Sequence, residues 1–166
     1  MLWFAGWAFK DGYSGIAATG KELIDNINEN YTYLKDTAGG ILSPIGIAWT
    51  RAMTLLPAVN LWGPDDAHQS LAGSYLTASV LFTAIFRTNP ERINYTGGID
   101  SITAATLRRI AYQTVIDSMA TNNLAAHTPT LSRSGTLLTA QPGFATYQWF
   151  ANDTLISSGT ANTLTA

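Results

Sequence analysis

The segment from Leu71 to Phe86 constrains the fold more than any other part of the chain, because it is apolar on nearly every side. A helix without a polar face must be covered by the rest of its domain, so this segment predicts a buried helix. Ser70 is expected to cap its first turn, and Asn89-Pro90 is expected to end it. With 46% hydrophobic and 12% charged residues, the chain has the apolar side chains that such a core needs.

The flanking sequence predicts a strand and further helices around this segment. Residues 2–9 are apolar and aromatic without a helical stripe, which is typical of a strand buried on both faces. The remaining patterns predict helices over 21–35, 48–56 and 102–119, and a short strand or extended segment over 41–47. Asp100 or Ser101 is expected to cap the last helix. Arg108 and Arg109 are expected on its solvated face.

The composition changes sharply near residue 122, which predicts two domains. From residue 128 onward Ser, Thr and Gly dominate, and Arg133 and Asp153 are the only charged residues. Strand-like patterns over 137–139 and 147–150 flank a Gln-Pro-Gly turn, which favours an all-β module. We therefore expect a first domain over 1–121, a linker over 122–127 and the first part of a β module over 128–166. Both ends of the chain interrupt strand-like patterns, so we expect a fragment of a longer protein.

Charge and cysteine content exclude several classes of function. A net charge of −2 without a basic run lacks the electrostatic signature of a nucleic-acid-binding protein. The absence of cysteine excludes disulfides, thiolate metal sites and cysteine nucleophiles. The two histidines, His68 and His127, have no metal-ligand spacing, so no metal and no cofactor is expected. The apolar runs are too short or too interrupted to span a bilayer.

A carboxylate precedes His68 by three residues in a turn-rich loop directly ahead of the apolar helix. A general base must be reachable, must titrate near neutral pH and must be oriented by a partner on its other ring nitrogen. His68 meets these requirements at the level of sequence, with Asp65 and Asp66 as nearby acids. The same four residues also fit an aspartate turn followed by a surface histidine, so the spacing alone leaves both interpretations open.

The wider sequence around this loop resembles a known family. Residues 65–75 resemble the last conserved block of the SGNH (GDSL-type) hydrolases, in which Asp-x-x-His supplies the acid and the base of a Ser-His-Asp triad. The segments 1–12, 33–35, 43–49 and 86–90 resemble one bacterial branch of these enzymes, so the resemblance covers about residues 1–120. It implies an α/β fold, with residues 1–121 as the C-terminal part of an α/β/α, flavodoxin-like domain that has a parallel sheet.

The resemblance also implies roles for individual residues. His68 would accept the serine proton and return it to the leaving alcohol, and Asp65, rather than Asp66, would hold the imidazole. Trp62 would either wall the substrate pocket or belong to the core. The Gly-Asp-Ser nucleophile motif of the family is absent, as are the glycine and asparagine of its oxyanion hole. The chain would therefore supply two members of a triad, and alone it is expected to be inactive.

The β module extends the resemblance. Residues 147–156 resemble the tryptophan-bearing strand and hairpin of an immunoglobulin-like sandwich, with Trp149 as a core anchor. Such modules are similar to those appended to secreted enzymes of Bacteroidetes-type bacteria, which implies a secreted, periplasmic or cell-surface protein. The implied substrate is a small-molecule or carbohydrate ester, with acetylated carbohydrate as one candidate, and no oligomeric state is implied. The alternative is a non-catalytic surface, carbohydrate-binding or adhesion protein that retains the scaffold.

Overall fold

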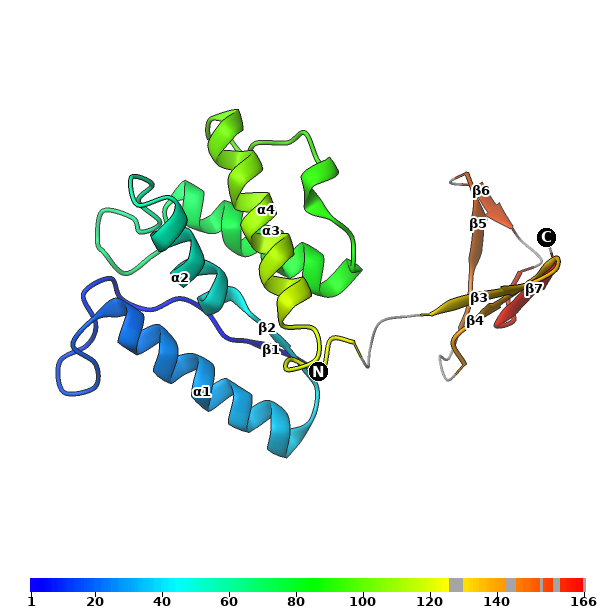
Figure 1. Cartoon of the computed structure of the whole chain (residues 1–166), viewed down its shortest axis with the longest axis horizontal. Coiled ribbons are helices and arrows are strands. Elements are labelled where there is room, and N and C mark those ends of the chain that lie inside the picture. The colour runs from blue at the N-terminus through cyan, green and yellow to red at the C-terminus, as the bar shows by residue number, and fades with distance from the viewer. Residues whose placement is uncertain (126–129, 143–145, 153, 157–158, 166) are drawn as a thin grey trace. The chain divides into compact units, whose positions relative to one another are not determined.

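The computed structural model describes residues 1–125, 130–142, 146–152, 154–156 and 159–165. Its internal contacts divide the chain into two units, Met1–His127 and Thr128–Ala166 (Figure 1). Each unit is described by itself below. In both units together, no described helix is long and apolar enough to cross a bilayer.

The first unit has an α/β arrangement built on a two-stranded parallel sheet. Strand β1 (Leu2–Phe4) pairs with strand β2 (Ile41–Ser43), with Leu2 opposite Ile41 and Phe4 opposite Ser43. Helix α1 (Gly20–Ala38) connects the two strands, as a parallel pair requires. In Figure 1 the sheet lies between α1 and the helices α3 (Leu71–Phe86) and α4 (Ser101–Asp117).

Both strands are shorter than the sequence predicts, because their ladder ends where β2 gives way to a helix. Pro44 follows β2 directly and helix α2 (Ile45–Leu55) begins one residue later, so the expected extended segment over 41–47 is wrong beyond Ser43. Proline has no N–H for a ladder and is compatible with the start of a helix. Beyond Phe4, the carbonyl of Ala5 accepts instead from Gly46 N, at 3.0 Å, in the first turn of α2. The expected strand over 2–9 is therefore confirmed only for Leu2–Phe4, and it is not buried on both faces as expected, because Phe4 is 41% exposed.

Local capping residues place the starts of α3 and α4 where the sequence predicts them. Helix α3 spans Leu71–Phe86, and the hydroxyl of Ser70 accepts from the backbone N–H of Gly73. Asp100, rather than Ser101, caps α4 by accepting from Thr103 N at 2.9 Å. Between these helices lies a short 3₁₀ helix, η1 (Pro90–Arg92).

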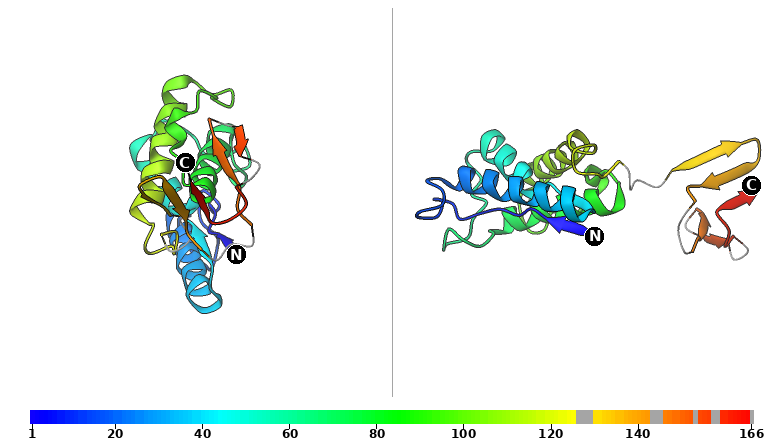
Figure 2. Two further views of the ribbon diagram at one scale, coloured as in Figure 1. Left: turned by 90° about the vertical axis from the view of Figure 1, so that its right-hand side faces the viewer. Right: turned by 90° about the horizontal axis from the view of Figure 1, so that it is seen from below.

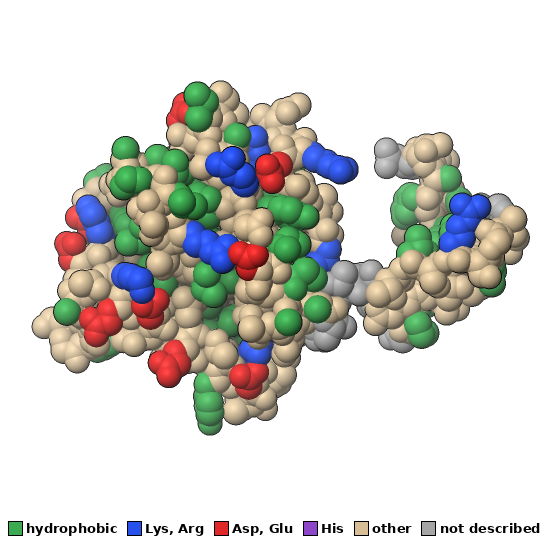
Figure 3. Space-filling model, viewed as in Figure 1, with side chains coloured by type: hydrophobic (Ala, Val, Ile, Leu, Met, Phe, Trp, Pro, Cys, Tyr) green, Lys and Arg blue, Asp and Glu red, His purple; other side chains and the backbone are tan. Residues whose placement is uncertain are grey.

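Helices α3 and α4 pack against each other, and with α2 they enclose the core (Figures 1 and 2). The largest fully buried side chains of these three helices are Trp49, Ile45, Leu76, Val80, Leu107 and Val115. Helix α3 is not buried on every side as expected, because Leu71, Ile85 and Phe86 are all more than half exposed. On the face shown in Figure 3, acidic and basic side chains are interspersed.

One of the two arginines expected on the solvated face of α4 is buried. Arg109 is exposed as expected, but Arg108 is buried, with only 8% of its surface accessible. The helix turns Arg108 toward α3, where its guanidinium donates to the hydroxyl of Tyr75. The prediction that Arg108 lies on the solvated face is therefore wrong.

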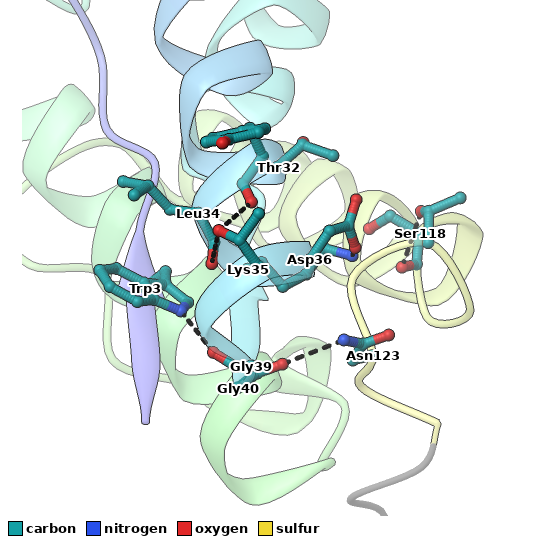
Figure 4. A network of polar contacts seen from close by, with 12 residues as sticks. Trp3, Thr32, Leu34, Lys35, Asp36, Gly39, Gly40, Ser118 and Asn123 are labelled. Atoms are coloured by element: carbon teal, nitrogen blue, oxygen red, sulfur yellow. Dashed lines mark hydrogen bonds and ion pairs between the residues drawn. The ribbon is translucent and has the colours of Figure 1, made fainter.

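The first part of the expected linker is packed into the first unit. Leu124 is fully buried, and Asn122 O accepts from Leu42 N at 3.0 Å along the edge of β2. Asn123 Nδ2 donates to Gly40 O at 3.2 Å, close to the end of α1, where Lys35 is paired with Asp36 (Figure 4). A linker over 122–125 is therefore wrong, and residues 126 and 127 lie outside the described residues.

The second unit contains short antiparallel strands. Three of them form one sheet in the order β3 (Leu131–Ser134), β4 (Leu137–Ala140) and β7 (Thr163–Thr165). Strands β5 (Trp149–Ala151) and β6 (Thr154–Ile156) form a hairpin. Trp149, the expected core anchor, is half-buried, and its indole N–H donates to Ala161 O at 2.9 Å. Asp153 lies outside the described residues.

Candidate functional site

The candidate site is the tip of the loop between α2 and α3. Trp62 and Gln69 form an isolated antiparallel bridge at the base of this tip. Gly63 N donates to His68 O at 2.7 Å, and Ser70 N donates to Leu61 O at 2.9 Å. These bonds close residues 63–68 into a compact turn directly ahead of α3.

Within this turn, one carboxylate contacts both the ring and the backbone of His68. Asp65 Oδ2 lies 2.5 Å from His68 Nδ1. Asp65 Oδ1 accepts from the backbone N–H groups of His68, at 2.9 Å, and of Ala67, at 3.1 Å. Asp65 therefore forms the aspartate turn of one interpretation, and it also makes the contact with the imidazole that the other interpretation requires. With Nδ1 donating to Asp65, Nε2 of a neutral His68 is the acceptor.

These contacts lower the pKa of the Asp65 carboxyl well below its usual range. The hydrogen bond with the His68 ring contributes most, followed by the backbone N–H groups of His68 and Ala67. Asp65 is therefore ionised throughout the neutral range. A permanent carboxylate at Nδ1 also favours the imidazolium that forms when Nε2 takes up a proton.

Asp66 has a different role in the same turn. Its backbone is left-handed, with φ of 53°. Its carboxylate forms an ion pair with Lys10 at 2.9 Å, and its carbonyl accepts from Lys10 N at 3.0 Å. Among the described residues, no hydrogen bond or ion pair joins Asp66 to His68. Asp66 therefore docks the turn onto the segment after β1, whereas Asp65 orients the histidine.

Of the two roles that the sequence leaves open for Trp62, the structure favours the core. Trp62 is 5% exposed, its ring meets the edge of Trp49 at 5.0 Å, and its indole N–H donates to Ala8 O at 2.8 Å. It does not line the groove beside His68.

Trp7 contacts the His68 turn, although the sequence does not point to it as a site residue. It stacks on Trp49 at 5.6 Å, and its indole N–H donates to Ala67 O at 2.9 Å, one residue before His68. The signal that could have identified it is its place just beyond the carboxyl end of β1, because ligands of open α/β sheets bind at that edge.

An apolar groove of about 580 Å³ lies beside His68. Its walls come from the segment after β1, from the first turns of α1 and from the His68 turn: Trp7, Ala8, Phe9, Tyr13, Ile16, Leu23, Ile27, Ala67 and His68. The His68 side chain is 86% exposed at its edge, and Phe9 and Tyr13 stack at 5.7 Å. An exposed basic nitrogen beside an apolar groove can act on the polar bond of a bound ligand while the groove holds the ligand's apolar part.

The serines nearest in sequence have other roles. Ser70 donates its hydroxyl hydrogen to Asn60 O and accepts from Gly73 N as the helix cap, and Ser74 is exposed. In the described part of the chain no serine is hydrogen-bonded to His68. The same residues contain no cluster of three or more His, Cys, Asp or Glu side chains that could hold a metal ion.

Comparison of the chain with protein-family models, with curated proteins and with solved structures found no match.

Proposed function

We propose that this chain supplies the acid and the base of an SGNH-type serine ester hydrolase. The observation that carries the proposal is the Asp65 Oδ2–His68 Nδ1 contact of 2.5 Å on an exposed histidine at the edge of an apolar groove. The family resemblance of residues 65–75 and the α/β arrangement of the first unit support the same assignment. In this proposal the nucleophilic serine comes from polypeptide outside these 166 residues.

The edge of β1 supports such an addition. Among the described strands β1 has one partner, β2, whereas the other edge of β2 is occupied by Asn122. A further parallel strand could therefore pair with β1. Because the carboxyl ends of parallel strands meet at one edge of a sheet, a serine that follows this strand would lie on the same side as His68.

The reaction follows from the position of Nε2. His68 Nε2 would accept the serine proton as the serine oxygen attacks the ester carbonyl, and Asp65 would stabilise the resulting imidazolium. The C–O bond to the alcohol then breaks, and the alcohol takes the proton from Nε2. Water repeats the sequence on the acyl-serine and releases the acid. The aromatic groove walls suit an apolar acyl group or the apolar face of an acetylated sugar ring.

We also propose that the second unit is part of an immunoglobulin-like module, in a protein that works outside the cytoplasm. The antiparallel strands and the Trp149 hairpin support it.

The test is ester hydrolysis by the reading frame that contains this sequence, expressed from its first codon and assayed with p-nitrophenyl acetate and an acetylated xylo-oligosaccharide. We expect activity that His68→Ala abolishes and that Asp65→Asn lowers by about 10⁴-fold. Asp66→Asn is the matched control, because it alters the same turn without touching His68, and it should retain most of the activity. Hydrolysis that survives His68→Ala would refute the proposal. An inactive, folded protein that binds the oligosaccharide would support the non-catalytic alternative.

A further inference from the structure

A second pocket lies against α3. It is about 190 Å³ in volume and is formed by α3, η1, α4 and the loop after η1. Its walls are mainly apolar and aromatic, from Tyr75, Ala78, Phe82, Ile93 and Tyr95, and Arg108 lies among them. It shares no lining residue with the His68 groove.

The unusual feature of this pocket is a buried cation without an anion. Arg108 is 8% exposed, and its Nη1 donates to the Tyr75 hydroxyl at 2.5 Å and to Tyr95 O at 3.2 Å. Both acceptors are neutral. No described acidic side chain forms an ion pair with Arg108, and its buried Nε has no hydrogen-bond acceptor among the described residues.

Such a guanidinium is costly unless an anion accompanies it. Arginine stays protonated in proteins, so it cannot avoid burial of its charge by losing a proton. A buried charge is ordinarily paired, because desolvation of an unpaired ion costs several kcal/mol. An anionic ligand in the pocket would offset this desolvation cost. The planar guanidinium of arginine matches the geometry of a carboxylate.

The size and the walls of the pocket narrow the class of ligand. A single cation balances a single negative charge, so a monocarboxylate fits better than a phosphate dianion. A cavity of about 150 Å³ lined by aliphatic and aromatic side chains accommodates benzene, so the present pocket is large enough for one ring. We propose that the pocket between α3, η1 and α4 binds a small monocarboxylate with an apolar, ring-sized body, with the carboxylate on Arg108.

Loop 93–98 is held so that it forms one wall of this pocket. Tyr75 donates its hydroxyl hydrogen to Tyr95 O at 2.6 Å, and Gly97, with φ of 63°, lies directly against the Tyr75 ring. A Cβ atom at Gly97 would approach Tyr75 Cδ2 to 2.8 Å, so the close approach requires glycine. The wall is therefore fixed by the same tyrosine that binds Arg108.

The test is calorimetric titration of the 166-residue chain with benzoate, with neutral benzamide of nearly the same shape, and with inorganic phosphate. We expect benzoate to bind at least tenfold more tightly than benzamide or phosphate. Amide shifts in the NMR spectrum should concentrate in α3, α4 and residues 93–98. Equal affinity for benzoate and benzamide, or shifts confined to other elements, would overturn the proposal.

Two variants and a matched control test separately whether binding depends on the charge of Arg108 and on the free volume of the pocket. Arg108→Gln should lower benzoate affinity at least tenfold, whereas Arg109→Gln, the exposed neighbour outside the pocket, should change it less than twofold. If Arg108→Gln fails to fold, Ala78→Phe decides, because Ala78 is an exposed wall residue and a phenyl ring there fills the pocket without touching the core. Unchanged benzoate affinity in Ala78→Phe would refute the site. Neither readout depends on ester hydrolysis, so failure here leaves the proposed function untouched.

Discussion

The indole N–H of Trp7 donates to the carbonyl oxygen of Ala67 at 2.9 Å, across sixty residues of sequence. This bond joins the segment after β1 to the residue immediately before His68. The same indole stacks on Trp49, which is fully buried in α2. The His68 turn is therefore anchored to the core through one tryptophan.

Replacing Trp7 by phenylalanine should loosen this turn. Trp7→Phe keeps an aromatic ring on Trp49 but leaves Ala67 O without its donor, so we expect a stability loss of about 1–3 kcal/mol. The amide of His68, which is bonded to Asp65, should exchange with solvent faster. Urea unfolding and hydrogen exchange measure the two effects. Trp3→Phe is the control, since it loses a similar bond to Gly39 O far from the turn, and equal acceleration of His68 exchange in both variants would contradict the anchoring role.

Asp65→Asn should change which ring nitrogen of His68 carries the proton. The amide oxygen of asparagine can still accept from the Ala67 and His68 backbone, so the turn survives. The amide NH₂ cannot accept from Nδ1–H, so the neutral ring loses its preference for the Nδ1-protonated tautomer. Long-range ¹⁵N NMR at a pH above the histidine titration distinguishes the tautomers. The Asp66→Asn chain should match the wild type, because Asp66 contacts Lys10 instead; a wild-type ring protonated on Nε2 would contradict the geometry.

The stability contributed by Asp65 should depend on pH in one direction. Its folded pKa is lowered, mainly by the hydrogen bond with the His68 ring, so the contribution is complete above the ordinary carboxyl pKa of about 3.9. It is lost as the pH falls below that value towards the folded pKa. The stability difference between wild type and Asp65→Asn should therefore shrink as the pH falls below about 4. Urea unfolding of both proteins over this range measures it, and other carboxyls cancel because both proteins contain them. A difference that grows as the pH falls below about 4 would show the opposite sign of the shift.

The sequence predicts best where a helix begins, because a capping residue lies next to the first turn. Ser70 begins α3 as predicted, because a cap acts on its immediate neighbours. The predicted stop signal Asn89-Pro90 does not end this helix: α3 ends at Phe86, where Arg87 has a left-handed backbone with φ of 55°, and Asn89 caps η1 instead. The sequence predicts too long a strand over 2–9, because the length of a strand also depends on how far its neighbouring strand extends. The partner, β2, ends at Ser43, thirty-odd residues away in sequence.

The candidate site shows the same division between local and distant contacts. Asp65 and His68 share one turn, so their spacing already predicts that they meet. Trp7 contacts this turn from sixty residues earlier in the sequence, and no local sequence pattern predicts that contact. Arg108 and Arg109 are about 100° apart around a helix, and only the position of Tyr75 on another helix decides which of the two is buried.

Gly73→Ala should destabilise the first unit at the point where α3 meets the His68 turn. An added Cβ would lie 2.2 Å from Leu61 O and 2.8 Å from the Trp49 ring, both of which belong to buried residues. Such overpacking costs about 1–3 kcal/mol, more than the gain in helix propensity from replacing glycine. Urea unfolding measures the loss. Ser74→Ala, at the exposed next position of the same helix turn, should change stability by less than about 0.5 kcal/mol, and a stabilised Gly73→Ala would contradict the close packing.

Tyr75→Phe should destabilise the wall of the second pocket without changing its apolar lining. The variant removes the hydroxyl that accepts from Arg108 Nη1 and donates to Tyr95 O, which leaves a buried guanidinium with one neutral acceptor fewer. Loss of a hydrogen bond to a charged group costs about 1.5–3 kcal/mol. The measurement is urea unfolding with and without saturating benzoate. Because benzoate supplies acceptors to the same guanidinium, it should stabilise Tyr75→Phe at least as much as the wild type. Tyr33→Phe, at an exposed position of α1, should behave as wild type in both conditions. If Tyr75→Phe unfolds at the same urea concentration as wild type, the Tyr75 hydroxyl does not stabilise Arg108.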